Sequence, residues 1–236
     1  MLTDTEKNLY DRHLIIPDFG IEAQEKLKAA RILIAGAGGL GSPVAIYLAA
    51  AGVGNIGIAD ADVVSLSNLQ RQIMYSYSDI GKSKVAVASQ KLSVQNPFIQ
   101  LHPYQLFLTE FIVDNIIKDY DVIIGALDNA PARYMLSDAC IRQSKAYIHG
   151  AISNFTGQVT VFNYKGGKTY RDLFSEPLHP SNMSPTDKGV FAPLPGLIGT
   201  LMAAEVIKVI TGCGEVLSGK MLVVDLKANL FQVVNY

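Results

Sequence analysis

A glycine-rich turn between a predicted strand and a predicted helix limits the folds open to this chain. The run RILIA at residues 31–35 is short and apolar, as in a buried strand, and the turn GAGGLG at 36–41 follows directly. Small apolar residues at 42–51 then predict a helix. Glycines here let the backbone approach a phosphate, and the free N–H groups at the helix start favour an anion. The turn therefore predicts nucleotide binding, with contacts expected at Gly36, Gly38, Gly39 and Gly41.

Strand-like and helix-like segments alternate through the first 143 residues. Further strands are expected at 55–59, 99–107 and 121–126, and further helices at 82–95, 110–118 and 131–143. This alternation favours an α/β fold: a Rossmann-like, mostly parallel sheet with helices on both faces.

Before the first strand, residues 4–29 predict two short helices broken at Pro17 and Gly20. The apolar positions available for packing in these helices are Leu14, Ile15, Ile21 and Leu27.

The pattern changes after residue 150. Strand-like segments at 146–151 and 157–164 lie close together, and 221–225 with 230–235 could form a closing hairpin. A proline-rich loop over 165–195, of a length that often serves as a binding element or lid, precedes an apolar helix at 197–211. We expect antiparallel strands that extend the sheet.

These segments predict a single domain over residues 1–236. Its expected parts are N-terminal helices at 4–29, a nucleotide-binding core at 30–150, and an antiparallel extension with the long loop and closing elements at 151–236.

Charge and composition weigh against several classes of partner. The chain has 20 Lys+Arg and 21 Asp+Glu, so nothing suggests nucleic acid or an anionic membrane as the main partner. Its apolar stretches are interrupted by Gly, Asp or Asn before membrane-spanning length, and its charged N-terminus lacks the apolar core of a signal peptide. A cytoplasmic protein that binds neither nucleic acid nor membrane is expected.

Polar residues follow the second and fourth predicted strands. Asp60 closes the second strand and is placed to accept a hydrogen bond from a ribose hydroxyl. The segment DADVVSLSNLQRQ at 60–72 brings acids, an amide and a guanidinium into one loop, and Lys84 opens the next helix. Because the carboxyl ends of strands line the ligand crevice of such sheets, Asp60, Arg71, Lys84 and Asp128 could converge on one nucleotide.

Simpler interpretations of the same residues remain open. Arg12, Arg71 and Lys84 could be ordinary surface cations. Asp128 could merely cap the helix that follows it, and Arg133 could pair with a nearby acid in a structural role.

Taken together, these segments resemble the adenylation domain of the ThiF/MoeB/HesA family, the bacterial relatives of ubiquitin-activating enzymes. The runs that carry the resemblance are GAGGLGS, DADVVSLSNLQRQ, Lys84 and DNAPAR, and it extends from LYDR at 9–12 to GVFAPL at 189–194.

The resemblance implies that a carboxylate attacks the α-phosphate of ATP and releases pyrophosphate. Because negative charge crowds the triphosphate, such a reaction depends on cations and fixed donors instead of a covalent nucleophile. By resemblance, Asp128 would hold Mg²⁺, Asp60 would bind the ribose, and the matching arginine, Arg12, would reach the ATP of the partner in a homodimer. Catalytic roles are thus implied for Arg12, Arg71, Lys84 and Asp128, and ATP contacts for Gly36, Gly38, Gly39, Gly41, Asp60, Asp62, Asn68, Arg71, Lys84 and Asn129.

The chain departs from many members of this family in its cysteines. The two residues Cys140 and Cys213 include no Cys-x-x-Cys pair, and the segment GKTYRDLF at 167–174 has none, so we predict no zinc. The segment SPTDK at 184–188 also lacks the cysteine that relatives acting beyond adenylation often carry. We therefore expect the enzyme to stop at the adenylate and pass it to a separate sulfur donor.

By resemblance, the favoured substrate is the C-terminal glycine carboxylate of a ubiquitin-like sulfur-carrier protein serving thiamine or molybdopterin synthesis. Alternatives are another peptide or small-molecule carboxylate, or a modified tRNA base, the last weakened by the near-neutral charge. An NAD-dependent oxidoreductase would explain the residues up to Asp60 but leaves Arg71, Lys84 and Asp128 without a role. A non-catalytic partner subunit is disfavoured because the basic and acidic residues are all present.

Overall fold

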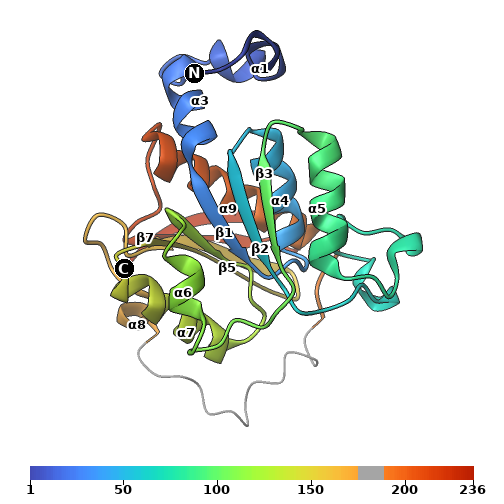
Figure 1. Cartoon of the computed structure of the whole chain (residues 1–236). Helices are drawn as coiled ribbons and strands as arrows, with labels where there is room; N and C mark the ends of the chain where they lie inside the picture. Colours follow the sequence, from blue (N-terminus) through green and yellow to red (C-terminus); the bar gives the residue numbers. More distant parts are fainter. Residues whose placement is uncertain (175–188) are drawn as a thin grey trace.

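The computed structural model describes residues 1–174 and 189–236 of the chain. Within that part the strands form one eight-stranded sheet in the order β3-β2-β1-β4-β5-β6-β7-β8 (Figure 1). The strands are β1 (Arg31–Ala35), β2 (Asn55–Ala59), β3 (Gln100–Tyr104), β4 (Val122–Gly125), β5 (Ala146–Ser153), β6 (Thr156–Phe162), β7 (Lys220–Asp225) and β8 (Leu230–Asn235). Strands β1 to β5 run parallel and β6 to β8 continue the sheet antiparallel, which confirms the predicted fold class.

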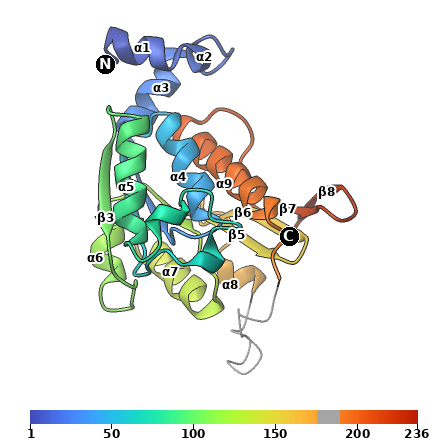
Figure 2. The same ribbon diagram turned by 90° about the vertical axis from the view of Figure 1, so that its right-hand side faces the viewer.

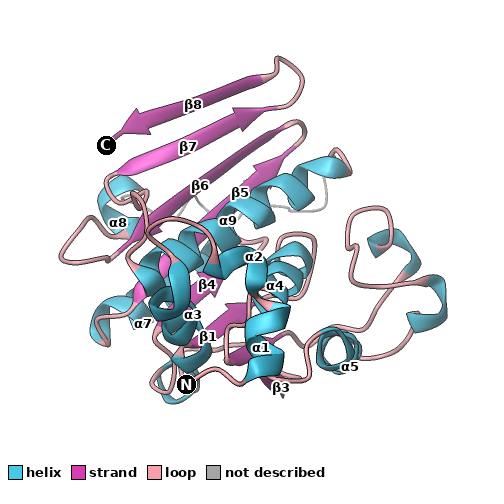
Figure 3. Ribbon diagram, turned by 90° about the horizontal axis from the view of Figure 1, so that it is seen from above, coloured by secondary structure: helices cyan, strands magenta, loops and turns pink. Residues whose placement is uncertain are grey.

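Helices cover both faces of this sheet. The helices are α1 (Asp4–Leu9), α2 (Asp11–Leu14), α3 (Gly20–Ala29), α4 (Gly41–Ala50), α5 (Lys84–Gln95), α6 (Val113–Ile117), α7 (Ala130–Arg142), α8 (Tyr170–Leu173) and α9 (Pro193–Thr211). Helices α4, α5 and α9 contribute to one buried cluster, and α6, α7 and α8 to the cluster on the other face (Figures 1 and 3).

Strand β1 explains how one short apolar run supports both clusters. Successive side chains of a strand point to opposite faces. Ile32 and Ile34 therefore pack toward α4 and α9, whereas Leu33 and Ala35 pack toward α6 and α7. All four are fully buried, so the strand lies at the centre of the protein.

Helix α9 corrects two expectations. It begins at Pro193, four residues earlier than predicted, because proline is well tolerated in the first turn, where its missing N–H has no partner to lose. It is also long and apolar enough to cross a membrane, contrary to the expectation that no stretch reaches that length, although half of that stretch is buried within the protein. The apolar residues of α9 pack on α4 and on strands β5 and β6.

The predicted long loop at 165–195 is shorter than expected in the described residues. Residues 170–173 form α8, and the loop ends where α9 begins. The central part of the predicted loop, residues 175–188, lies outside the described residues.

The N-terminal segment forms an arm, residues 1–29, at the end of the sheet where β1 begins (Figures 1 and 2). It contains three helices where two were predicted. Leu27 is fully buried, but Ile15 and Ile21, which were expected to pack, are 63% and 52% exposed. The reason is that the arm packs on the body mainly through α3 against α9, which leaves its other sides in solvent.

The buried His149 on β5 generates a prediction about acid stability. The residue is 1% exposed, and its Nε2 accepts a hydrogen bond from the Gln158 amide at 3.3 Å. Burial, aided by the positive charge of Arg133, lowers the pKa of His149 to about 3. The folded pKa lies below the unfolded value of about 6.5. The contribution of neutral His149 to the free energy of unfolding is therefore fully present above about pH 6.5 and is lost as the pH falls toward 3.

We predict that replacing His149 by Gln will reduce the pH dependence of unfolding between pH 6 and pH 4 by up to about 1.4 kcal/mol per pH unit. The measurement is urea unfolding of the wild type and His149→Gln at several pH values in this range. Equal slopes for the two proteins would contradict the prediction.

Candidate nucleotide-binding site

The glycine turn after β1 is confined between the ends of β2 and β4. The N–H of Gly36 donates to the carbonyl of Ala59 at 2.8 Å. Gly36 has φ +101°, and a Cβ there would lie 2.5 Å from the carbonyl oxygen of Ala126. A Cβ on Gly41 would meet the Gly36 carbonyl. Glycine is therefore required at Gly36 by conformation and by space, and at Gly41 by space alone.

Asp60 joins the end of β2 to this turn. Its Oδ2 accepts from the backbone N–H of Ala37 at 2.8 Å, and its Oδ1 accepts from the N–H of Asp62 at 2.8 Å. The hydroxyl of Tyr75 donates to the carbonyl of Ala37 at 2.7 Å. Burial, with the nearby charge of Asp60, raises the pKa of Tyr75, so the phenol stays protonated as this donor. Asp60 and Tyr75 thus fix both backbone polar groups of one residue in the turn, Ala37.

Lys84 is a nearly buried cation beside two acids. It opens α5 as predicted, is 4% exposed, and its Nζ lies 2.8 Å from Asp62 Oδ2 and 3.9 Å from Asp60 Oδ2. The side chain of Asp62 is 56% exposed. Since a buried charge is costly without a partner, Asp62 balances Lys84 at the edge of the site. This burial excludes the interpretation of Lys84 as an ordinary surface cation.

Arg71 reaches the turn from the loop between β2 and α5, which also carries Asn68. The Cγ of Arg71 lies 3.7 Å from the position that a Cβ on Gly39 would take. The Arg71 guanidinium donates to the Ser67 carbonyl at 2.9 Å. Asn68 Oδ1 accepts from the Ser65 N–H at 3.3 Å. Arg71 therefore lies against the glycine turn, on a loop braced by Asn68.

Gln72 and Pro195 also line the turn, and neither was predicted as a site residue. Gln72 is 4% exposed, with its Nε2 3.5 Å from the position of a Cβ on Gly38. Its Oε1 is buried and has no hydrogen-bond partner within the described residues. Pro195, from α9, lies 3.2 Å from the position of a Cβ on Gly39. Gln72 belongs to the loop at 60–72, but its burial depends on contact with the turn at 36–41, which local sequence pattern does not indicate.

Asp128 and Asn129 occupy the turn after β4. Asn129 is the N-cap of α7: its Oδ1 accepts from the Ala132 N–H at 2.9 Å, and its Nδ2 donates to Asp128 Oδ1 at 3.1 Å. The alternative in which Asp128 itself caps the helix is therefore wrong. Among the described residues Arg133 forms no ion pair with an acid, contrary to expectation; its guanidinium donates to the Leu127 carbonyl at 2.8 and 3.1 Å, which holds the turn.

The acidic residues fit a nucleotide-bound magnesium ion better than a metal cage made by protein alone. Residues 1–174 and 189–236 contain no group of three or more His, Cys, Asp or Glu side chains able to hold a metal. Mg²⁺ commonly binds through one or two carboxylates, together with phosphate oxygens and waters. Asp128 follows the carboxyl end of β4, and its exposed carboxylate meets that requirement.

Arg12 is the one predicted site residue that the structure leaves apart. It lies on α2 in the N-terminal arm, its side chain is 89% exposed, and its nearest charged neighbour is Asp11 at 3.9 Å. The arm stands where β1 begins, whereas the glycine turn follows the end of β1 (Figure 1). Arg12 therefore cannot join the other site residues within one chain.

The two cysteines also lie away from the turn. Cys140 is buried in α7, and burial raises the pKa of its thiol. Cys213 follows α9, and its thiol donates to the carbonyl of Asp18 at 2.9 Å. Because the first turn of α9 contacts Gly39, its 19 residues carry Cys213 to about 27 Å from the site.

We predict that Gly36→Ala will lose nucleotide binding and destabilise the protein by roughly 2–5 kcal/mol, since the added Cβ combines a strained φ with a backbone clash. The measurements are urea unfolding and ATP titration calorimetry. Gly166→Ala is the matched control: it has φ +77° with nothing within 4 Å, and should cost about 1–2 kcal/mol without changing ATP affinity. Unchanged ATP affinity in Gly36→Ala would contradict the predicted contact.

The chain is similar to proteins named as adenylyltransferases. A probable molybdopterin-synthase adenylyltransferase of Porphyra purpurea is 47% identical over 92% of this chain and 57% of its own length. A sulfur carrier protein adenylyltransferase of Thermus thermophilus is 42% identical over 94% of this chain and 84% of its own length. The chain thus spans about half to three-fifths of the length of several curated relatives that it matches.

Solved structures share the fold. PaaA superposes with a TM-score of 0.84 at 23% identity, covering 99% of this chain and 74% of that one. MccB of E. coli superposes with a TM-score of 0.83 at 24% identity, covering 97% of this chain and 71% of that one. The model of the ThiF family matches residues 10–236, and the chain therefore belongs to the ThiF family.

Proposed function

We propose that this protein uses ATP to adenylate the C-terminal glycine carboxylate of a ubiquitin-like sulfur-carrier protein, with release of pyrophosphate. The observation that carries the proposal is the meeting of a buried lysine, an arginine and three acids around one glycine turn, at the point where β1 is flanked by β2 and β4. In open sheets this is where nucleotides bind. The names of the relatives, which include a sulfur carrier protein adenylyltransferase, support the substrate class.

In this proposal the site residues act by binding and orienting the triphosphate. The backbone N–H groups of the glycine turn, held by Asp60 and Tyr75, meet phosphate oxygens, and Arg71 lies alongside to add positive charge. When the nucleotide binds, the Lys84 ammonium exchanges its ion pair with Asp62 for one with the phosphates. The positive charge that Asp62 neutralises in the free protein then neutralises the nucleotide. The Gln72 Oε1, which has no hydrogen-bond partner among residues 1–174 and 189–236, is placed to accept a hydrogen bond from the bound ligand.

The same site accounts for the chemistry without a covalent nucleophile on the enzyme. Asp128 is the residue that would hold Mg²⁺, and the ion would supply positive charge to the phosphates. The carboxylate of the carrier is the nucleophile and pyrophosphate is the leaving group. The burial of Cys140, and the position of Cys213 after α9 at about 27 Å from the turn, support transfer of the adenylate to a separate sulfur donor.

A homodimer completes this proposal, with Arg12 of each subunit serving the site of the other. Support comes from the separation of Arg12 from the turn and from the apolar side chains that the arm exposes. These exposed side chains are Leu9, Ile15, Ile16 and Ile21. We place the reaction in the cytoplasm, in molybdopterin or thiamine synthesis, without zinc. The family membership leaves the oxidoreductase alternative without support.

We predict that Asp128→Ala will lower Mg²⁺-dependent ATP–pyrophosphate exchange by more than about a hundredfold, because it removes the metal anchor. The exchange is measured with carrier proteins ending in Gly-Gly, with either a free or an amidated C-terminus, and only the free carboxylate should support it. Asp119→Ala, an exposed aspartate before the start of β4, is the control and should keep full activity. Exchange that persists with the amidated carrier would overturn the proposed substrate.

We predict that mixing Arg12→Ala and Asp128→Ala subunits will restore activity. Each mixed dimer then has one site with both residues intact, and so about half of the normal activity. The control mixture, Lys84→Ala with Asp128→Ala, should stay inactive because both of these residues belong to the same chain's site. No recovery in the first mixture would reject the shared site.

A further inference from the structure

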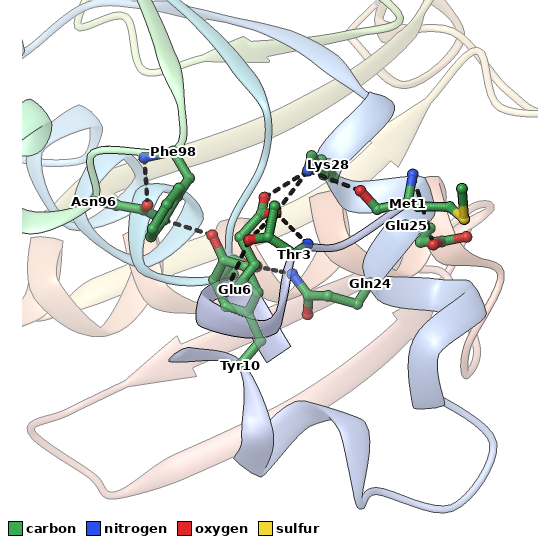
Figure 4. Close-up of polar contacts among 10 residues, drawn as sticks. Met1, Thr3, Glu6, Tyr10, Gln24, Glu25, Lys28, Asn96 and Phe98 are labelled. Carbon is green, nitrogen blue, oxygen red and sulfur yellow. Dashed lines mark hydrogen bonds and ion pairs between the residues drawn. The ribbon is translucent and has the colours of Figure 1, made fainter. Parts of the chain in front are cut away.

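Buried polar contacts hold the helices of the N-terminal arm together and fasten the arm to the body of the protein (Figure 4). In α1, Glu6 is 2% exposed and binds the Lys28 ammonium at 2.7 Å and the backbone N–H of Thr3 at 2.8 Å. Although burial acts to raise it, the pKa of Glu6 is lowered by the hydrogen bonds from Lys28 and Thr3. The carboxylate is thus a charged anchor for α1.

A second set of contacts fastens α2 on both sides of Arg12. On one side, Tyr10 is 4% exposed and its hydroxyl accepts from Asn96 Nδ2 at 2.9 Å; the same amide donates to the carbonyl of Ala49 at 2.7 Å (Figure 4). Gly52, at φ +82°, makes room for the tyrosine ring, since a Cβ there would lie 2.5 Å from Tyr10 Cζ.

On the other side, Gln24 connects His13 to the end of α4. Gln24 is fully buried, and its Nε2 donates to the Ala51 carbonyl at 2.8 Å. Its Oε1 must therefore accept from His13 Nδ1, 3.0 Å away, which fixes the proton of a neutral His13 on Nδ1. The His13 ring also packs against Phe19, with centroids 5.0 Å apart.

The bonds that start from Tyr10, through Asn96, and from Gln24 both lead to the C-terminal end of α4. Ala49 and Ala51 close the helix that begins at Gly41 in the glycine turn. The anchor of α2 is therefore about 15 Å from the turn of its own chain. Between Tyr10 and His13, both fixed by these bonds, the Arg12 side chain stays 89% exposed. A rigid backbone that carries a fully solvated arginine is the arrangement needed to present that arginine to another molecule.

We propose that Gln24 and Tyr10 are positioning residues that hold α2 so that Arg12 is presented to the nucleotide site of a second copy of this chain. The inference rests on the shared site of the proposed function. It goes further by assigning the alignment of that arginine to two buried side chains that do not touch substrate. Their effect on activity must then appear in the partner's site and not in their own.

The test uses mixed dimers in which one subunit carries Asp128→Ala, so its own site is inactive. The active site of each mixed dimer then has Asp128 from the other subunit and Arg12 from the Asp128→Ala subunit. Gln24→Leu placed in the Asp128→Ala subunit should lower ATP–pyrophosphate exchange on the order of tenfold to a hundredfold. The same substitution in the other subunit should leave exchange within about twofold. In homodimers, Gln24→Leu added to Arg12→Ala should cause no further loss.

Two further variants keep the test informative if Gln24→Leu folds poorly. Tyr10→Phe keeps the ring that fills the space at Gly52 and removes the hydroxyl that Asn96 binds, so it should show the same dependence on placement, more weakly. Glu6→Gln is the matched control, a buried polar anchor of the arm that holds α1 and not α2, and it should show no dependence on placement.

The positioning role is wrong if Gln24→Leu and Tyr10→Phe lower exchange equally in either subunit, or in neither. The shared site would still be supported in that case if the Arg12→Ala and Asp128→Ala mixture recovers activity. If that mixture recovers no activity, the shared site and the positioning role are both rejected.

Discussion

The close approach of the turn after β1 to the ends of β2 and β4 is the constraint on which the site depends. The Gly36 N–H is bonded to the end of β2, while its α-carbon packs against the carbonyl that follows β4. No side chain fits between them, so the turn is pressed against both neighbouring strand ends. The loops that continue β2 and β4, which carry Asp60 and Asp128, are brought to the same edge as a result.

Charge at this edge is balanced before any ligand arrives. Lys84 is almost wholly removed from water, and such a charge is tolerated only with partners at hand. Asp62 supplies the close partner and Asp60 a more distant one, and Asp60 is itself bound to the backbone of the turn. The free protein therefore holds a lysine in place at low cost, with an exposed carboxylate as the partner that a more strongly charged phosphate can replace.

Helix α4 connects the glycine turn to the point where the N-terminal arm is attached. Gly41, the first residue of α4, belongs to the glycine turn. Carbonyls at the C-terminal end of α4 accept the hydrogen bonds from Gln24 and Asn96 that fix the arm. A helix is stiff over such a length, so the arm and the turn keep a constant separation. That separation explains why Arg12 is excluded from its own chain's site, and it makes a symmetric pair of chains a natural way to use the residue.

Much of the fold and part of the site followed from local pattern. The strands, and the positions of the glycine turn, Asp60 and Asp128 after β1, β2 and β4, were predicted correctly because apolar runs and the breaks between them are local features of a parallel sheet. The start of α9 and the third helix of the arm were missed. The prolines of 193–195 indicate a loop or a helix start equally well, and packing against α4 decides between them.

By itself, then, the sequence determined the order of strands and helices, the place of the turn and the residue types around it, since these depend on neighbours along the chain. Only the tertiary structure decided that Gln72 is buried beside Gly38, that Asn129 and not Asp128 caps α7, and that Arg12 stands at the far end of α4. Each of these depends on contacts between segments that lie far apart in sequence or on a choice between adjacent polar residues. Long-range contacts and the choice between adjacent polar residues both depend on packing in three dimensions, which the local sequence pattern does not indicate.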